Sequence, residues 1–352
     1  MQKDAPAVTV SEAVPDITVA GRRLRPGPVF DTYWRFAVVR QEAYFARLRD
    51  GAAPSGDPIL AAHRFTNCYR AADRVSQFAI HDVGYGGPQE PRDVVFRMVL
   101  FKFFNKIDTW RLLEAELGPV TWASWRPAAA RAVLDTAWRA GRRLYSPAYV
   151  IPPPRLGGAR KHHDHLLLAE TMIRDGLAEK VQDARGLAHV FALLRAYPGL
   201  GDFLAFQFAT DLGYTSVLDF SENDFVVAGP GARDGIRKCF GPAARGIEDA
   251  VIAYTTDTQE AHFARLGLRF DTLGGRPLHL VDCQNLFCEV DKYARVAHPD
   301  VAGVSGRTRI KQRYHRSGEP MPAPWFPPKW GITEAVRAQA AAVVVPAMGS
   351  PA

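Results

Sequence analysis

A glycine-rich turn and a carboxylate further along the chain are the residues whose types and spacing could do chemistry together. Residues 193–235 read LLRAYPGLGDFLAFQFATDLGYTSVLDFSENDFVVAGPGARDG, in which two helix-forming runs flank a turn at residues 198–201, and Asp224 follows some twenty residues later. Gly199 and Gly201 leave backbone N–H groups accessible where the second run begins, near Asp202, and these donors can hold an anion at the positive end of the helix dipole. A carboxylate nearby can stabilise positive charge on a sugar whose base is leaving, and can orient a water molecule.

The order helix, Pro-Gly-x-Gly turn, helix, Asp resembles the helix-hairpin-helix DNA glycosylases. The resemblance implies that Gly199 and Gly201 approach a DNA phosphate and that a downstream aspartate is catalytic. Asp224 stands at about the expected distance, whereas Asp211 and Asp219 are alternatives. A turn that only joins two packed helices is the competing interpretation.

One departure from the resemblance concerns the product. Glycosylases of this type that also cleave the strand carry a lysine just after the hairpin, where it acts as an amine nucleophile. Phe203 occupies that place in this chain. The resemblance therefore implies a monofunctional enzyme that uses water and leaves an abasic site.

Six further phrases extend the resemblance over roughly residues 30–330. They are YWRFAVVRQ (33–41), FTNCYRAADRVSQF (65–78), FKFFNKIDTW (101–110), FATDLGYTS (208–216), SENDFVVAGPGARDGIRK (221–238) and DCQNLFCEVDKYAR (282–295). Together they resemble the alpha-glutamyl/putrescinyl-thymine pyrophosphorylases, whose domain is also described as the helical domain of 5-hydroxymethyl-deoxyuridine DNA kinases. That family is associated with hypermodified pyrimidines in phage DNA, and an anti-phage branch removes glucosylated hydroxymethylcytosine.

The resemblance implies a glycosylase that excises a hypermodified pyrimidine, such as glucosylated hydroxymethylcytosine, from double-stranded phage DNA in anti-phage defence. Two alternatives stay open. One is a transferase or pyrophosphorylase that modifies hypermodified thymine with a second small-molecule substrate, and the other is a DNA-binding module without chemistry. No cofactor and no obligatory protein partner are expected.

A polar stripe in residues 65–78 is a candidate pocket for a base that has left the stack. Arg70, Asp73, Arg74 and Gln77 are spaced to share one helical face, and Gln207 lies about one turn beyond Phe203. The alternative is an internal ion-pair network that braces the core. The substrate-binding candidates are Asn67, Tyr69, Arg70, Asp73, Gln77, Gln207 and Asn223.

Basic residues supply candidate DNA contacts, because the net charge of +7 suits a polyanion. The odd-numbered cations Arg307, Arg309, Lys311 and Arg313 would share one face of an extended strand, with His315 and Arg316 beside them. A second candidate is GPGARDGIRK (229–238), a turn and helix start that does not fit the Walker phosphate loop. It contributes Gly229, Gly231, Arg237 and Lys238.

Metal and membrane sites are not expected. The segment KHHDH (161–165) has adjacent histidines that cannot both face one side of a helix, and Cys283 and Cys288 have no second ligand pair nearby. Four scattered cysteines favour a reducing cytoplasm. No apolar run is long enough to span a bilayer, and the first residues do not form a secretory signal.

Helical spacing dominates, so the sequence predicts a mainly α fold with a small mixed C-terminal extension. The expected domains are a flexible arm at 1–28, a helical domain at 29–330 that could divide into two lobes near 151–160, and a tail at 331–352. Helices are expected from Asp31 to Gly51, over 57–80, 93–104 and from Asp108 to Gly118, and from Pro127 to Ala140. Helices resume near His165, a segment that begins as a strand and ends as a helix starts at Leu278, and a last helix covers 335–345.

Overall fold

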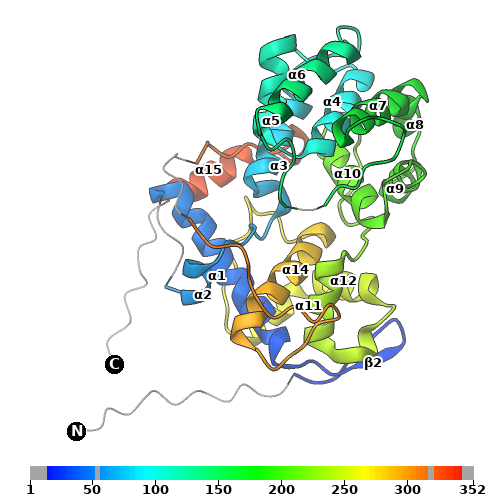
Figure 1. The fold of residues 1–352 in the computed structure, drawn as a ribbon. Coiled ribbons are helices and arrows are strands. Elements are labelled where there is room, and N and C mark those ends of the chain that lie inside the picture. Colours follow the sequence, from blue (N-terminus) through cyan, green and yellow to red (C-terminus); the bar gives the residue numbers. More distant parts are fainter. Residues whose placement is uncertain (1–13, 52–55, 149, 316–320, 343–352) are drawn as a thin grey trace.

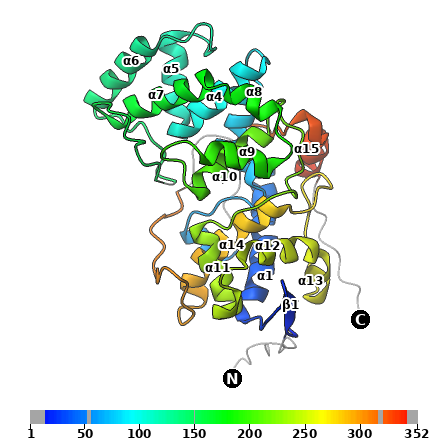
Figure 2. The same ribbon diagram turned by 90° about the vertical axis from the view of Figure 1, so that its right-hand side faces the viewer.

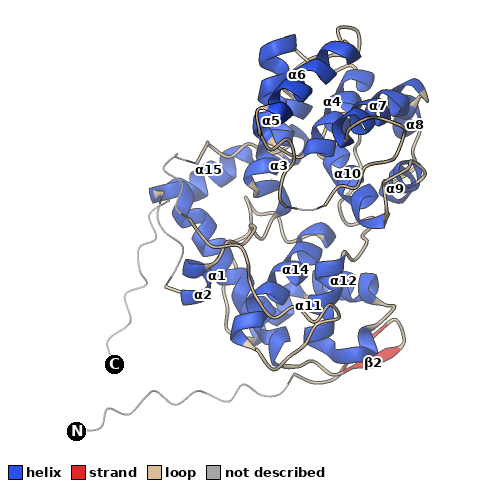
Figure 3. Ribbon diagram, viewed as in Figure 1, coloured by secondary structure: helices blue, strands red, loops and turns tan. Residues whose placement is uncertain are grey.

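The computed structural model describes residues 14–51, 56–148, 150–315 and 321–342, and these residues are mainly helical (Figure 3). The predicted mainly α fold is confirmed. The strands that the structure describes form one antiparallel hairpin, β1 (Ile17–Val19) with β2 (Arg22–Leu24).

The helices pack around two hydrophobic cores. Figures 1 and 2 show the helices as two corresponding groups. The first core contains the hairpin and the helices α1 (Pro28–Asp50), α2 (Pro58–Ala62), α11 (Pro230–Phe240), α12 (Glu248–Asp257), α13 (Gln259–Arg265), α14 (Leu280–Ala297) and α15 (Thr333–Ala341). The second core contains α3 (Arg74–Phe78), α4 (Pro91–Phe104), α5 (Ile107–Leu117), α6 (Pro127–Arg139), α7 (Lys161–Arg174), α8 (Leu177–Gln182), α9 (Leu187–Arg195) and α10 (Asp202–Gly213). The second core is therefore inserted into the chain of the first.

Helix α10 belongs to both cores. Its Leu204 and Phe208 are buried in the second core, whereas Phe206 is buried in the first. The residues between α10 and α11, numbered 214–229, carry the chain back to the first core. Polar groups on α10 and on this connection consequently lie where the two cores meet.

Local sequence signals explain several helix ends. α1 has proline in its first turn, and Gly51 closes it in the left-handed conformation, with φ of 58° and an N–H bond to the Arg47 carbonyl. α4 is buried on nearly all sides, as an apolar run without a polar face requires. Its C-cap is Asn105, also left-handed.

Close contact between α11 and α14 explains the glycines of residues 229–238. A Cβ atom at Gly235 would lie 2.0 Å from the carbonyl oxygen of Phe287, and one at Gly231 would lie 3.1 Å from Cys288 Sγ. Lys238 is buried, and its Nζ atom lies 3.0 Å from Asp291 Oδ1 on α14. The glycines and this ion pair hold the two helices together.

The structure differs from the sequence expectations in four places. The expected strand from Leu278 is wrong, because α14 is helical from Leu280. The helix expected over 57–80 is interrupted by residues 63–69. The loop at 151–158 joins α6 and α7 inside the second core, so the two cores divide near residues 78 and 218 instead. Parts of the expected arm and tail are ordered, as the β1–β2 hairpin and α15.

Candidate functional site at the junction of the two cores

The hairpin turn joins α9 to α10 as the sequence predicts. Gly199 has φ of +80°, which only glycine adopts at low cost, and a Cβ atom there would lie 3.3 Å from Pro154 Cα. Gly201 is the extended N-cap of α10, and a Cβ atom there would meet open space. The first N–H groups of α10 have no acceptor within the helix, so this end can hold an anion.

Asp211 lies at the centre of a buried polar cluster. Its Oδ1 is 2.6 Å from Arg70 Nη1, and its Oδ2 is 2.5 Å from Lys102 Nζ, with all three side chains at most 9% exposed. Arg70 also donates to Gln207 Oε1, at 3.0 Å from Nη2. Burial opposes ionisation, but the positive charges of Arg70 and Lys102 lower the pKa of Asp211. Asp211 is therefore an ionised group whose oxygens are both engaged.

Two further carboxyl groups extend this cluster toward α14. Asp282 Oδ1 accepts the N–H of Arg70 at 2.9 Å, and its Oδ2 accepts the N–H of His279 at 3.1 Å. Burial, and then the negative charge of Glu222, raise the pKa of Asp282 to about 7. Burial also raises the pKa of Glu222, although that group is paired with Arg276, whose guanidinium lies 3.9 Å from the centre of the Trp330 ring. We name Arg70, Lys102, Gln207, Asp211, Glu222, Arg276 and Asp282 the junction cluster.

Asp224 has different surroundings from Asp211. It is exposed in a turn on the connection between α10 and α11, and its N–H donates to the Ser221 carbonyl at 3.2 Å. The neighbouring Asn223 uses its Oδ1 to accept the N–H of Leu280, at 3.1 Å, in the first turn of α14. Asp224 is thus an exposed carboxylate that this contact holds at the edge of the junction. Asp219, five residues earlier, is exposed as well.

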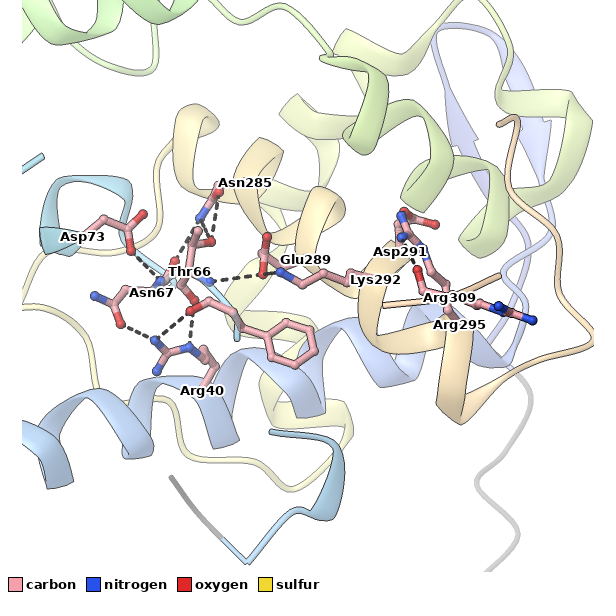
Figure 4. A network of polar contacts seen from close by, with 11 residues as sticks. Arg40, Thr66, Asn67, Asp73, Asn285, Glu289, Asp291, Lys292, Arg295 and Arg309 are labelled. Carbon is pink, nitrogen blue, oxygen red and sulfur yellow. Dashed lines mark hydrogen bonds and ion pairs between the residues drawn. The ribbon is translucent and has the colours of Figure 1, made fainter. Parts of the chain in front are cut away.

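The candidates at residues 67–77 do not form one stripe. Asp73 is the N-cap of α3, and its Oδ1 accepts the N–H of Asn67 at 2.8 Å. Asn67 in turn accepts from Arg40, and Asn285 donates to the Asn67 carbonyl, so this segment is tied to α1 and α14 (Figure 4). Tyr69 is buried, and its hydroxyl donates to the Arg276 carbonyl. Of the predicted pocket residues, Arg70 contacts Asp211 directly, and Gln207 is linked to it through Arg70.

Gln77 and Arg74 have separate surroundings. Both ends of the Gln77 amide are bonded to backbone, Nε2 to the Ala71 carbonyl and Oε1 to the N–H of Trp325. Arg74 begins α3 and is exposed. These two side chains are not part of the junction cluster.

The basic segment at 307–313 is exposed but is not a strand. Arg313 forms an isolated bridge with His63, and the N–H of Arg64 donates to the Gln312 carbonyl, so the segment lies beside residues 62–64. Arg307, Arg309, Lys311 and Arg313 are exposed, as are Thr308 and Gln312. Arg316 lies outside the described residues. The contact of Arg307, Arg309, Lys311 and Arg313 with DNA stays a prediction.

The DNA-binding candidates at residues 229–238 differ in whether they are exposed. Gly229 and Gly231 lie close to Phe203 and Cys288 respectively, and Lys238 is paired inside the first core. Arg237 is half-buried. We therefore leave Lys238 out of the proposed DNA interface.

A possible metal-binding group occurs in the second core. The interpretation that His162 and His163 cannot face one side is wrong, because their Nε2 atoms lie 2.9 and 3.0 Å from Asp135 Oδ1. The ligand atoms of these three residues lie within 4.8 Å of one another. The same Asp135 oxygen also binds the guanidinium of Arg160, which a metal ion would have to displace.

Sequence reasoning missed Lys102, Glu222, Arg276 and Asp282 as members of a site. Lys102 offered a signal, since it is a cation within the apolar run of α4, and a charge buried there needs a partner. Asp282 begins the phrase DCQNLFCEVDKYAR, for which the sequence suggested no role. Glu222 and Arg276 are 54 residues apart and meet only in the folded chain.

Within the part of the chain that the structure describes, the helices are too short or too polar to cross a bilayer. The four cysteines are all free thiols.

Comparison with known proteins gives one family. The family model described as "5-hmdU DNA kinase, helical domain" matches residues 27–303. No curated protein and no solved structure matches the chain. The matched residues include the hairpin turn, the junction cluster and Asp224, and cover more than half of the chain. The chain therefore belongs to the family of the 5-hmdU DNA kinase helical domain.

Proposed function

We propose that this protein is a monofunctional DNA glycosylase that excises a hypermodified pyrimidine from double-stranded DNA, with Asp224 as the catalytic carboxylate. Membership of a family that processes modified bases in DNA supports the substrate class. The observation that carries the assignment of Asp224 is its exposure on the connection between α10 and α11, whereas the alternative Asp211 is buried and has both of its oxygens bound by cations.

In this proposal the N-terminus of α10 and the glycine turn hold a DNA phosphate next to the flipped nucleotide. The bond between the base and C1′ of the sugar breaks, and the electron pair leaves with the base. Asp224 stabilises the positive charge on the sugar and orients the water whose oxygen bonds to C1′. The water loses a proton, and the base gains one.

In this proposal the junction cluster positions the hairpin helix α10 relative to α14. Arg70 joins α10, through Gln207 and Asp211, to α14, through Asp282. This pairing fixes the hairpin helix relative to the helix against which Asn223 is bonded. In the proposal, this arrangement positions the phosphate-binding turn relative to Asp224, as catalysis by a fixed carboxylate requires.

The test is incubation of the purified protein with phage DNA that carries glucosylated hydroxymethylcytosine, beside unmodified DNA. Released base is measured by mass spectrometry, and abasic sites by alkali cleavage. We expect release from the modified DNA alone, with no strand cleavage before alkali. Asp224→Asn should abolish release and keep DNA binding.

The matched control is Asp219→Asn, which removes an exposed carboxylate from the same connection and should leave release intact. If Asp219→Asn loses base release and Asp224→Asn keeps it, Asp219 is the catalytic carboxylate instead of Asp224. Release that requires an added small-molecule substrate would support the transferase or pyrophosphorylase alternative. Binding of modified DNA without any release, from this or other hypermodified pyrimidines, would leave a DNA-binding module.

A defence function is a further part of the proposal and rests on family resemblance. Cells that express the protein should reduce plaque formation by a phage with glucosylated hydroxymethylcytosine and not by the same phage without the modification. Asp224→Asn should remove this difference.

A further inference from the structure

A basic cavity lies on the second core, away from the junction cluster. It has a volume of ≈ 460 Å³ and is formed by the end of α6, residues 142–145 and the start of α7. The polar and aromatic side chains that line it are Trp138, Arg142, Arg143, Tyr145, Arg160, Lys161 and His162. Cations and aromatic rings on one concave surface are the groups that bind a phosphate and a nucleobase together.

The charges of this cavity are only partly balanced. Arg160 is paired with Asp135. In the described part of the chain, Arg142, Arg143 and Lys161 form no ion pair. Lys161 Nζ lies 3.9 Å from the centre of the Tyr145 ring, and burial lowers the pKa of this amine. Three cations are therefore available to an anion.

One aromatic side chain is also available. Trp138 is 51% exposed, whereas large apolar side chains in this protein are mostly buried. The guanidinium of Arg160 lies 4.2 Å from the centre of one ring of Trp138. Asp135, which also contacts His162 and His163, holds that guanidinium in place. The indole is thus fixed on one side and open elsewhere, which suits stacking of a flat ligand.

The surroundings connect this cavity to the hairpin turn. An adjoining cavity of ≈ 420 Å³ shares Arg160 and Lys161 and is also lined by Arg155 and Pro153. The next residue, Pro154, is the one that a Cβ atom at Gly199 would touch. Residues 153–161 therefore line both cavities at one end and contact the hairpin turn through Pro154 at the other.

We infer that the cavity at Trp138 binds a nucleotide of a DNA strand, with its phosphate against Arg142, Arg143 and Lys161 and its base stacked on Trp138. The site is an extension of the DNA path beyond the hairpin. It rests on DNA as the substrate class of the proposed function, but not on base excision. An acidic peptide would pair with the cations but would not use the exposed indole.

The test measures the affinity of the full chain for fluorescent oligonucleotides of unmodified DNA, single- and double-stranded, by anisotropy over a range of salt concentrations. Arg142→Ala combined with Arg143→Ala should lower the slope of log affinity against log salt by about 1, because both arginines act on the one phosphate that the cavity neutralises. Trp138→Ala should weaken binding about 5-fold or more, while Trp138→Phe, which keeps a ring, should retain most of it. Circular dichroism verifies that each variant is folded.

The matched control is Arg131→Ala, which removes an exposed cation from α6 outside the cavity and should leave affinity and salt slope unchanged. If the cavity variants bind every oligonucleotide as the unaltered protein does, the inference is wrong. If they lose only the binding of a free deoxynucleoside monophosphate, the cavity holds a free nucleotide and the strand path is excluded. Unmodified DNA serves as the probe, so failure of base release does not affect this result.

Discussion

Asp211 balances two buried cations, so its replacement should mainly lower the stability of the folded protein. In Asp211→Asn, Arg70 and Lys102 lose the carboxylate that both contact. Breaking a buried pair by removing one partner costs about 3–5 kcal/mol. We expect a loss of that size in the free energy of unfolding, measured by urea titration. Asp224→Asn, at an exposed position, should change it by at most about 0.5 kcal/mol.

The opposite results would contradict a structural role for Asp211 and a catalytic role for Asp224. A stable Asp211→Asn protein without base release would show that Asp211 takes part in the chemistry. An unstable Asp224→Asn protein would show that Asp224 has a structural contact that its exposure conceals.

Asp282 makes stability depend on pH. Its pKa of about 7 in the folded chain exceeds the value of about 4 for an exposed aspartate, so the folded state binds this proton more tightly than the unfolded state. The stabilising contribution of the proton is complete below about pH 4 and is lost as the pH rises through about 7. The unfolding free energy of the native protein relative to Asp282→Asn should therefore fall between about pH 4 and pH 7.

Denaturant titrations of both proteins at several pH values measure this difference. Burial raises the pKa of Asp73 to about 6 and gives a dependence of the same sign, but Asp73 is present in both proteins and cancels. A difference that stays constant over the range would show that Asp282 does not titrate there.

At the scale of elements, the close contact of α11 with α14 depends on a glycine, Gly235, which has no side chain. The Cβ atom of Gly235→Ala would lie 2.0 Å from a backbone oxygen of α14, so the helices must separate or the protein must unfold. We expect a loss of at least about 1–3 kcal/mol, the usual cost of overpacking, measured by thermal unfolding. Gly201→Ala, whose Cβ atom would meet open space, is the control and should change stability little. Equal stability of the two variants would contradict the close packing.

Local sequence predicts the elements well where capping residues are local. Gly51 ends α1 and Pro127 begins α6 as the sequence predicts, because a single residue marks each end. The start of α1 is less well predicted: the helix begins at Pro28, before the expected Asp31, which lies in its first turn. The run LHLVD has the short alternation of a strand, but α14 begins there as a helix with a capping box between His279 and Asp282 and packs on α11 and α1. Tertiary contacts override such weak local preferences.

The junction cluster was harder to predict, for a related reason. Arg70, Lys102 and Asp211 come from three segments that are far apart in sequence. Their charges were visible, but their pairing is a property of the folded chain. The hairpin turn, in contrast, is one local segment, and its position before α10 could be predicted from glycine and proline alone.

For the whole molecule, the position of the basic segment leads to a prediction about binding. Arg307, Arg309 and Lys311 lie on the first core, whereas Arg142 and Arg143 lie on the second. If both surfaces contact one DNA molecule, replacing the first three by alanine should lower the salt slope by about 3, in addition to the effect of the cavity variants. Anisotropy with long and short duplexes measures this. An unchanged slope on every duplex would remove the basic segment from the DNA path.

The insertion of one core into the other sets an order for folding during synthesis. Tyr33 of α1 packs against Phe287 of α14, with ring centres 4.5 Å apart, so α1 has to wait for a helix made some 250 residues later. The second core is continuous in sequence and is complete when residue 218 has been made. On the ribosome, the inserted core can therefore fold while the apolar face of α1 is still exposed and needs protection by chaperones. Nascent chains stalled before residue 280 should resist protease in the inserted core and be cut within α1.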